Sequence, residues 1–317
     1  MLKTYRDPNQ RMFRSRLLQF PFDLLMACGV SLQNANRASH LISSLHFQPL
    51  SVLHGLRFEK ERKHVAHTIA CLSRVQEPKI HVMYVTHEGD FGLFLASLMS
   101  LERLNASQVG RVYVLEDSGK PFSPVSKETL SQRCGIQLRF IRSRFPLAIR
   151  GPALVASEML AFAQISATSG ENEYIAKVDS DTLFVSDEGF SRVLASEADI
   201  LGERVNIWEP FSYVQGGCYF LRCGMIPRMF SVPLRPVFRS VARATWKLTT
   251  SQVPEDGAIH ELVNRCQGKA IFIDDLFVPW YGDHKSRSSK GSVAHLRMAT
   301  KSEYEEFASW FEKVVNK

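Results

Sequence analysis

Two carboxylates one residue apart interrupt an apolar run near the middle of the chain. The segment YIAKV at 174–178 leads into Asp179 and Asp181, and apolar residues resume at 183–185. In extended backbone, side chains at i and i+2 point the same way, so both carboxylates can approach one hard divalent cation. Close acids at a buried strand end repel each other unless a cation offsets them. The pattern predicts a Mn²⁺ or Mg²⁺ site that holds a nucleotide diphosphate, and a surface Asx turn is the structural alternative.

Two later motifs could complete such a site. Gly216 and Gly217 lie within the strand-like run VQGGCYFLR, where they would let the backbone approach a ligand closely or form a β-bulge. Glu255 and Asp256 precede the helical run AIHELVNR. Acids at a helix start are expected from capping and the helix dipole alone, but a partly buried carboxylate there can also act as a general base. We expect Asp256, with Glu255 as the alternative, to accept a proton from the group that attacks.

A basic segment near the C-terminus contains a further candidate ligand. His295 could be an ordinary structural histidine or a ligand to Mn²⁺ beside the carboxylates. Lys290 and Arg297 flank it, and both side-chain types suit phosphate. The functional interpretation is a loop that faces the diphosphate.

The elements that must position these residues form an alternating series. Apolar runs predict strands, and longer runs between them predict helices. The predicted strands are 79–86, 111–117, 136–143 and 174–185, the last broken by the acids, and the predicted helices are 91–104, 126–134 and 152–167. This order implies an α/β fold with a parallel, doubly wound sheet, and such sheets bind ligands at the carboxyl ends of their strands. Four further polar side chains fall at those ends and are candidate nucleotide contacts: Thr86, Asp90, Glu116 and Asp117.

The motifs and their order resemble those of GT-A glycosyltransferases, which share an Asp-x-Asp (DxD) motif after a strand of the nucleotide-binding half. The run 214–226 resembles the glycine-glycine strand of inverting fringe-like and β1,3-glycosyltransferase families, 253–263 their Glu-Asp segment, and 293–298 their C-terminal histidine segment. The resemblance implies a GT-A sheet, a nucleoside-diphosphate sugar donor such as a UDP-sugar, a metal bound by Asp179, Asp181 and His295, and inversion with Asp256 as base. Those families typically have three consecutive acids where this chain has Asp-Ser-Asp.

Composition sets outer limits on class and location. The 317 residues carry a net charge of +7, which favours anionic ligands. The six cysteines show no CxxC spacing, as expected for reduced thiols in the cytoplasm. No apolar stretch is long enough for a transmembrane span. The basic N-terminus is instead a candidate for peripheral contact with a membrane surface.

Charge distribution suggests the nature of the acceptor. No acid occurs between Pro210 and Pro254, whereas this stretch includes Arg235, Arg239 and Arg243. Either these arginines form a solvated face or they contact an anionic acceptor, such as a glycan, a lipid-linked glycan or modified DNA.

The predicted organisation is a helical accessory region at 1–76 and a catalytic domain at 77–317. Residues 77–185 would hold the nucleotide sugar and 186–317 the acceptor. Two other functions stay open: a nucleotidyltransferase or related metal-dependent nucleotide enzyme, and a non-catalytic nucleic-acid-binding protein. The first would call for a P-loop or more carboxylates, and no GxxxxGK[ST] is present. The second leaves unexplained why two acids interrupt a buried strand.

Overall fold

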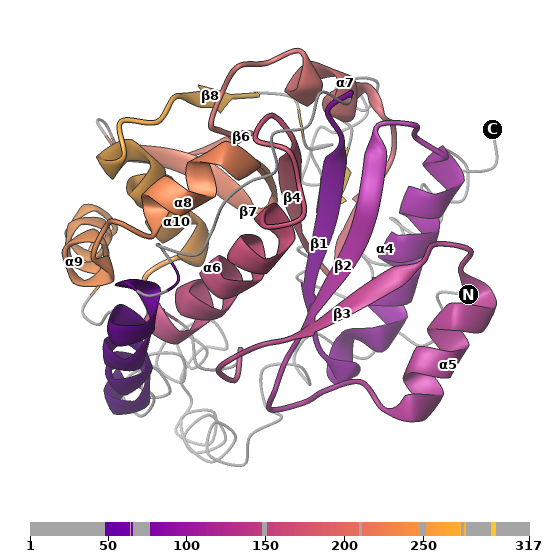
Figure 1. Cartoon of the computed structure of the whole chain (residues 1–317), viewed down its shortest axis with the longest axis horizontal. Helices are drawn as coiled ribbons and strands as arrows, with labels where there is room; N and C mark the ends of the chain where they lie inside the picture. Colours follow the sequence, from indigo (N-terminus) through magenta and orange to yellow (C-terminus); the bar gives the residue numbers. More distant parts are fainter. Residues whose placement is uncertain are drawn as a thin grey trace, which may run out of the picture.

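A mostly parallel sheet of seven strands with helices on both faces forms the body of the protein (Figure 1). The computed structural model describes residues 48–63, 65, 77–147, 151–208, 211–247, 252–273, 276 and 293–295. The strand order is β3-β2-β1-β4-β7-β6-β8, with antiparallel pairing only between β4 and β7 and between β6 and β7. The α/β fold predicted from the alternating pattern is confirmed.

The first part of the sheet follows the predicted alternation closely. Its elements are β1 (Ile80–Thr86), η1 (Glu88–Asp90), α4 (Phe91–Leu104), β2 (Val109–Glu116), α5 (Pro124–Arg133), β3 (Leu138–Arg142), α6 (Pro152–Ser166) and β4 (Tyr174–Asp179). Local sequence explains two of the helix starts. Ser123 caps α5 by accepting a hydrogen bond from the Ser126 amide, and Pro152 occupies the first turn of α6, where no amide hydrogen is required.

The second part adds the antiparallel strands and the helices that cover them. Its elements are α7 (Glu188–Leu194), β6 (Ile200–Trp208), β7 (Phe211–Arg222), η2 (Cys223–Met225), α8 (Ile226–Met229), α9 (Leu234–Ala244), α10 (Glu255–Arg265) and β8 (Ala270–Phe272). A single sheet therefore runs through both parts of the chain.

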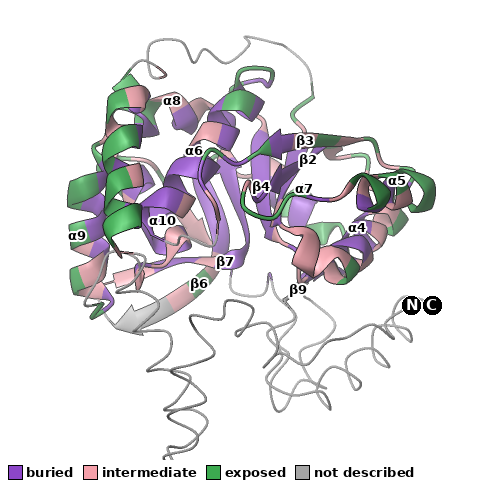
Figure 2. Ribbon diagram, turned by 90° about the horizontal axis from the view of Figure 1, so that it is seen from below, coloured by how far each residue is buried: buried purple, intermediate pink, exposed green. Residues whose placement is uncertain are grey.

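Two hydrophobic clusters fill the space on either side of the sheet. Because strand side chains alternate between faces, Met83 of β1 packs in the cluster beneath α6, α8, α9 and α10. Its neighbours Val82 and Tyr84 pack in the cluster beneath α4, α5 and α7. Figure 2 shows the central strands, among them β4 and β7, as buried between these helices. Burial on both faces accounts for the continuous apolar runs by which the parallel strands could be predicted.

The strand predicted at 174–185 differs from the structure in one respect. β4 ends at Asp179, and β5 (Thr182–Phe184) belongs to a separate two-stranded sheet with β9 (Val293–His295). The apolar residues after the two acids therefore do not continue β4. They turn away to pair with a segment more than a hundred residues further along the chain, a pairing that local periodicity does not encode.

A helix at 48–63 packs against the main body and agrees with the helical character predicted for the N-terminal region. Phe58 is buried beside Phe230, and Arg62 donates a hydrogen bond to the Phe230 carbonyl at 2.8 Å. Residues 1–47 and 66–76 lie outside the described part of the chain. None of the helices within the described ranges is long and apolar enough to cross a membrane.

Candidate active site

The three central motifs meet at the carboxyl edge of the sheet, although they are far apart in sequence. Strand register sets Thr86 level with Glu116, and Val85 level with Asp179, so β1, β2 and β4 end together. The Thr182 hydroxyl donates a hydrogen bond to the Gly217 carbonyl at 2.8 Å, which joins the DxD turn to the glycine pair. The Glu-Asp pair opens α10 beside the same glycines.

A buried lysine links all three motifs. The ammonium of Lys177 lies 2.6 Å from Asp179 Oδ1, 2.8 Å from the Gly216 carbonyl oxygen and 3.4 Å from Glu255 Oε1. Its side chain is almost fully buried. Lys177 thus ties the first DxD acid to the start of α10, and the geometry of each depends on the other.

The charge of this lysine is maintained by the acids around it. Burial alone would lower the pKa of Lys177, but Asp179, Glu255 and Glu158 together raise that pKa well above its usual range. The ammonium therefore stays charged and offsets part of the negative charge of the surrounding carboxylates.

Two further buried groups near Lys177 have no hydrogen-bond partner within the described structure. Glu158 of α6 is fully buried, its Oε1 lies 4.0 Å from Lys177 Nζ, and neither carboxyl oxygen is hydrogen-bonded. Burial raises the pKa of Glu158 well above its usual value. The hydroxyl of Tyr219, whose ring lies 5.8 Å from Lys177 Nζ, is also unpartnered. Buried polar groups are nearly always paired, so this cluster is built at a cost in stability.

Asp256 is a buried acid whose surroundings raise its affinity for a proton. It is buried, and burial followed by the neighbouring Glu255 raises its pKa to about 8. Its Oδ1 accepts a hydrogen bond from the Gly257 amide at 2.8 Å. Lys177 contacts Glu255 within 3.4 Å, whereas Asp256 has no such ion pair among the described residues. The two acids therefore differ in their surroundings, because Glu255 is paired with Lys177 and Asp256 is not.

Gly216 leaves room for the two acids of α10. A Cβ at this position would come within 2.9 Å of Asp256 Oδ2 and 3.1 Å of Glu255 Oε1, so the two carboxylates would have to shift. The backbone dihedral is not the constraint, because the only described glycine with positive φ is Gly151. The sequence predicted that the backbone at this glycine pair comes close to another group, and at Gly216 that group is the pair of acids at the start of α10.

The cation site predicted at the DxD motif includes a pair of partly exposed carboxylates. Asp179 and Asp181 are both half-buried, and strand register pairs Thr182 with His295, so the backbone of His295 lies beside the DxD turn. Among the described side chains, no three His, Cys, Asp or Glu residues lie close enough together to hold a metal ion. Two carboxylates do suit Mg²⁺ or Mn²⁺, which are commonly held by one or two carboxylates together with water and substrate phosphates.

The remaining predicted contacts fall into two groups. Thr86 is buried with an unpartnered hydroxyl, and Asp90 accepts a 3.4 Å hydrogen bond from Ser180 within the DxD turn, so both lie beside the site. Glu116 pairs with Lys127 and accepts a hydrogen bond from the Phe122 amide.

Asp117 is similarly engaged, since its Oδ1 accepts hydrogen bonds from the Gly119 and Leu147 amides. In this structure the carboxylates of Glu116 and Asp117 thus fix nearby loops, and their contact with a nucleotide stays a prediction. Lys290 and Arg297 lie outside the described residues.

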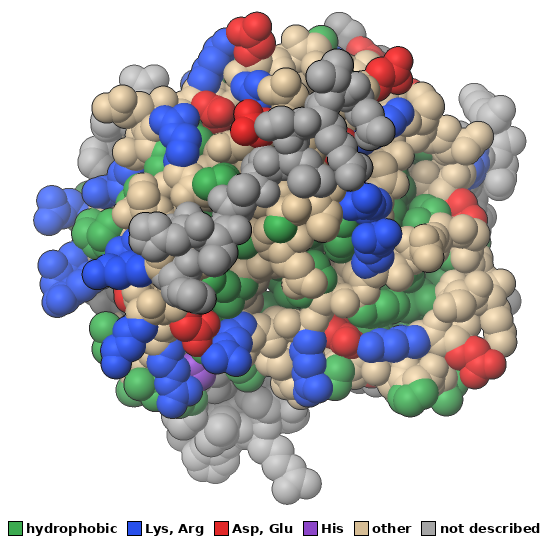
Figure 3. Space-filling model, in the orientation of Figure 1, with side chains coloured by type: hydrophobic (Ala, Val, Ile, Leu, Met, Phe, Trp, Pro, Cys, Tyr) green, Lys and Arg blue, Asp and Glu red, His purple; other side chains and the backbone are tan. Residues whose placement is uncertain are grey.

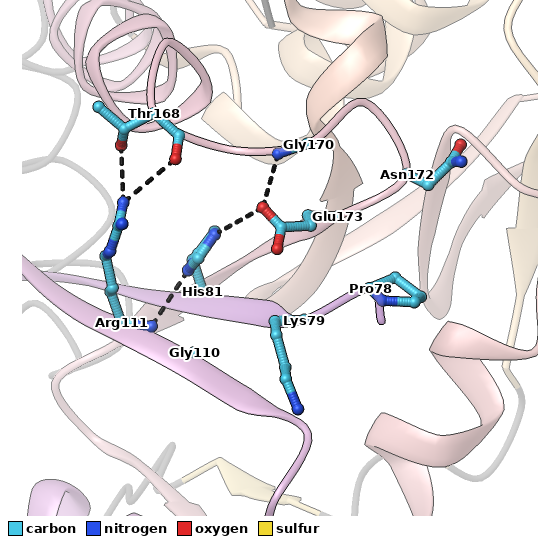
Figure 4. Close-up of a pocket in the computed structure, with 9 residues that line it drawn as sticks. All are labelled: Pro78, Lys79, His81, Gly110, Arg111, Thr168, Gly170, Asn172 and Glu173. Atoms are coloured by element: carbon cyan, nitrogen blue, oxygen red, sulfur yellow. Dashed lines mark hydrogen bonds and ion pairs between the residues drawn. The ribbon is translucent and has the colours of Figure 1, made fainter. Parts of the chain in front are cut away.

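A cavity of about 250 Å³ lies at the opposite edge of the sheet, near the amino ends of β1 and β4 (Figure 4). There His81 Nε2 is 3.2 Å from Glu173 Oε2, which also accepts a hydrogen bond from the Gly170 amide. Arg111 bonds to Thr168, and its amide donates to His81 Nδ1. The polar side chains that meet in Figure 4 are therefore paired with one another.

Lys177 and Glu158 are site residues that the sequence interpretation missed. Each leaves a trace in the sequence: Lys177 is the one charge within YIAKV, and Glu158 is the one charge within the apolar run PALVASEMLAFAQIS. A charged residue inside a buried element is rare unless it is paired. That signal could have identified both residues, though not their proximity to each other.

Comparison with known proteins yields structural likenesses only. No protein-family model matches the chain, and no curated protein matches it in sequence. The galactosyltransferase LgtC in complex with donor and acceptor sugar analogs is 10% identical, with 74% of this chain and 95% of that chain covered and a TM-score of 0.48. Mouse xyloside xylosyltransferase 1 is 12% identical, with 70% and 98% covered and a TM-score of 0.46.

A third solved structure of this kind is the mannosyltransferase PcManGT from Pyrobaculum calidifontis, in complex with GDP-Man and Mn²⁺. It is 13% identical, with 77% of this chain and 70% of that chain covered and a TM-score of 0.42. All three are glycosyltransferases by name. At these identities and scores, the likeness assigns the chain to no family.

Proposed function

We propose that this protein is a metal-dependent glycosyltransferase that moves a sugar from a nucleoside-diphosphate sugar, such as a UDP-sugar, to an acceptor hydroxyl with inversion. The observation that carries the proposal is the convergence at one sheet edge of a DxD pair, a close-approach glycine and a buried acid with a raised pKa. Lys177 contacts the first acid of the DxD pair, the carbonyl of Gly216 and Glu255, the neighbour of the buried acid Asp256. Doubly wound sheets bind nucleotides at this edge.

The donor would lie over the carboxyl ends of β1 and β4. Asp179 and Asp181 would hold Mn²⁺ or Mg²⁺, with His295 as a third ligand, and a bound cation would supply positive charge to the departing diphosphate. Thr86 and Asp90 line the same edge and would contact the nucleotide. Lys290 and Arg297 belong to a basic stretch of the sequence. They would add positive charge near the phosphates.

Asp256 would act as the general base. The acceptor oxygen forms a bond to the anomeric carbon while the bond from that carbon to the diphosphate oxygen breaks. The hydroxyl proton passes to the Asp256 carboxylate, and the bonding electrons leave with the nucleoside diphosphate. A pKa of about 8 makes this carboxylate a far better proton acceptor than an ordinary aspartate. Attack from the side opposite the leaving group inverts the anomeric carbon.

Lys177 and Glu255 would position these groups without touching the reacting atoms. Because Lys177 pairs with Glu255, it holds the first turn of α10 and leaves Asp256 as the acid available for the acceptor. We further propose that residues 77–185 bind the donor, that 186–317 bind the acceptor, and that 1–76 form an accessory region. An anionic acceptor, such as a glycan, a lipid-linked glycan or modified DNA, fits the basic stretch between Pro210 and Pro254.

A hydrolysis screen tests this proposal. Purified protein would be incubated with Mn²⁺ and a panel of nucleotide sugars, and release of free sugar and nucleoside diphosphate would be measured, since water can take the place of the acceptor hydroxyl. We expect release from one donor and none with Asp181→Asn. Release of sugar 1-phosphate instead, which follows from attack at the phosphorus next to the nucleoside, would favour a nucleotidyltransferase, and no reaction with any donor would contradict the proposal.

A further inference from the structure

We propose that the helix at 48–63 and helix α9 together form a surface that binds anionic lipid bilayers. We call it the flank surface. It comprises the exposed residues of helix 48–63, the arginines of α9 and Trp246. The flank surface is separate from the catalytic acids, so lipid binding does not depend on sugar transfer. Its α9 arginines belong to the basic stretch for which an anionic acceptor is proposed above, and here we assign these three arginines to the lipid surface.

The helix at 48–63 exposes an apolar half followed by a basic half. Leu50, Val52, Leu53 and Leu56 are all exposed, and Leu56 retains 57% of its accessible surface. Further along the same helix, Arg57, Lys60 and Lys63 are exposed. Aliphatic side chains next to cationic ones on a helix surface are typical of helices that lie in the headgroup region of a membrane.

Helix α9 adds an unbroken basic stripe. Arg235, Arg239 and Arg243 recur every fourth residue, so they share one face, and all three are exposed. The opposite face is buried, with Val241 packed near Gly257 at the start of α10. The stripe therefore points away from α10 and its acids. Among the described residues, none of the three guanidinium groups forms an ion pair.

Helix 48–63 and helix α9 are in direct contact. Glu59 accepts a hydrogen bond from the Leu234 amide at the start of α9, and Arg62 bonds to the carbonyl of Phe230. The basic half of helix 48–63 thus lies next to the first arginine of the stripe. The two nearby acids are internally engaged, since Glu59 pairs with Arg62 and Glu61 with Arg144. In Figure 3, Lys and Arg side chains gather at the left edge, over the position of α9, with hydrophobic side chains between and below them.

Trp246 supplies a second apolar anchor at the far end of the stripe. Its side chain is 80% exposed, and its backbone is left-handed, with φ of 54°, which is unfavourable for a bulky residue. The turn is held by a hydrogen bond from the Lys247 amide to the Ala242 carbonyl. Tryptophan is enriched at membrane interfaces, where the ring lies among headgroups.

The combination favours a lipid surface over a nucleic acid. Both present phosphates to the arginines and lysines, but a duplex offers nothing to four exposed aliphatic side chains. A bilayer pairs its phosphates with the basic groups and takes the aliphatic side chains into its boundary layer. One bilayer therefore accounts for both kinds of exposed side chain.

Vesicle sedimentation of the full chain tests the inference. The probes are vesicles of phosphatidylcholine mixed with phosphatidylglycerol, and vesicles of phosphatidylcholine alone. One variant combines Arg235→Ser, Arg239→Ser and Arg243→Ser, and a second combines Leu53→Ser and Leu56→Ser. The control combines Arg103→Ser, Arg133→Ser and Arg139→Ser, which makes the same change in net charge on exposed arginines of α4, α5 and β3.

We expect the wild type to bind the anionic vesicles and to dissociate as salt rises. Each basic residue near a charged membrane contributes about fivefold in affinity, so the α9 triple variant should bind about 10²-fold more weakly. The Leu53/Leu56 variant should also bind more weakly, and the control should bind as the wild type does. Circular dichroism and melting temperature would verify that each variant is folded.

Three results would overturn the inference. The first is no binding of the wild type to anionic vesicles. The second is equal binding by the α9 variant and its control, which would reduce the effect to net charge. The third is binding that survives Leu53→Ser and Leu56→Ser unchanged while duplex DNA competes for the same arginines, which would identify a nucleic acid as the partner.

Discussion

The two edges of the central sheet differ in whether their buried charged groups have hydrogen-bond partners. At the amino edge, His81, Glu173, Gly170 and Arg111 form a closed network in which each carboxylate and ring nitrogen has a partner. At the carboxyl edge, one lysine lies among several acids, and Glu158 beside it has no hydrogen bond at all.

This difference indicates which edge is adapted for a ligand. A network in which the polar groups are paired with one another stabilises the fold and needs no ligand to satisfy those groups. An edge with surplus carboxylates, a raised pKa and unsatisfied buried oxygens stores an unfavourable charge distribution that a cation or a proton relieves. We infer that the amino edge is structural and that the carboxyl edge is the one that reacts.

The largest expected effect is on turnover at the carboxyl edge. Asp256→Asn should lower kcat by about 10²–10⁴, the usual contribution of a general base, and should leave donor affinity nearly unchanged. Turnover and donor affinity would be measured separately, with Glu255→Gln as the comparison. Near-normal turnover of Asp256→Asn together with a severe loss in Glu255→Gln would transfer the role of base to Glu255.

Stability should respond strongly to the loss of Lys177. Lys177→Met removes the only cation within reach of Asp179, Glu255 and Glu158 among the described residues, and removing one partner of a buried ion pair typically costs about 3–5 kcal/mol. Chemical unfolding would measure this loss. Lys79→Met, a change at the amino edge that removes a single bond to the Ser107 carbonyl, is the control and should cost far less. Equal losses for the two variants would argue against Lys177 as the centre of the cluster.

Changes of one glutamate at each edge should have opposite signs. Glu158→Met replaces a buried carboxyl that makes no hydrogen bond with an apolar side chain of similar size, so we expect the free energy of unfolding to rise by about 1 kcal/mol. Glu173→Gln weakens bonds to His81 and Gly170, so we expect a loss of about 1–2 kcal/mol. A loss of the same size in both variants would show that the two edges do not differ in this way.

The smallest expected effect is on the pH dependence of the free energy of unfolding. The folded-state pKa of Asp256 is raised from 3.8 to about 8, so the folded protein retains a proton that the unfolded chain releases. The stabilisation from this group is complete below pH 3.8 and is lost as pH rises through about 8. Unfolding free energies across this range should fall less steeply in Asp256→Asn than in the wild type, and parallel curves would contradict the raised pKa.

The sequence anticipated the first part of the sheet better than the site. Apolar runs located β1, β2 and the start of β4, because strands that are mostly buried on both faces leave a continuous signal. The strand predicted at 136–143 corresponds to β3, although this strand is only partly buried. The approximate position of the DxD acids followed from the same reasoning. The separate pairing of β5 with β9 could not be predicted, since it joins short segments that are distant in the chain.

Contacts between side chains were the least predictable feature. Lys177 and Glu158 come from different elements and meet only through tertiary packing. Glu116 and Asp117 fell at a strand end as expected, but their engagement with loop amides depends on loop conformations that no periodicity reveals. Residue type predicted where the candidate site lies, and packing determined which acids there have no hydrogen-bond partner among the described residues.

The central claim is that the carboxyl edge binds a nucleoside diphosphate together with a divalent cation. The most direct measurement is the melting temperature of wild type and Asp181→Asn with Mn²⁺ and each of UDP, GDP and ADP, with Mn²⁺ alone and nucleotide alone as controls. A ligand of the folded state raises stability by about 2.7 kcal/mol at a hundred times its Kd. We predict that one nucleotide raises the melting temperature of the wild type only with Mn²⁺, and that Asp181→Asn keeps its fold but loses the shift. An equal shift in Asp181→Asn, or no shift of the wild type with any nucleotide, would contradict the account.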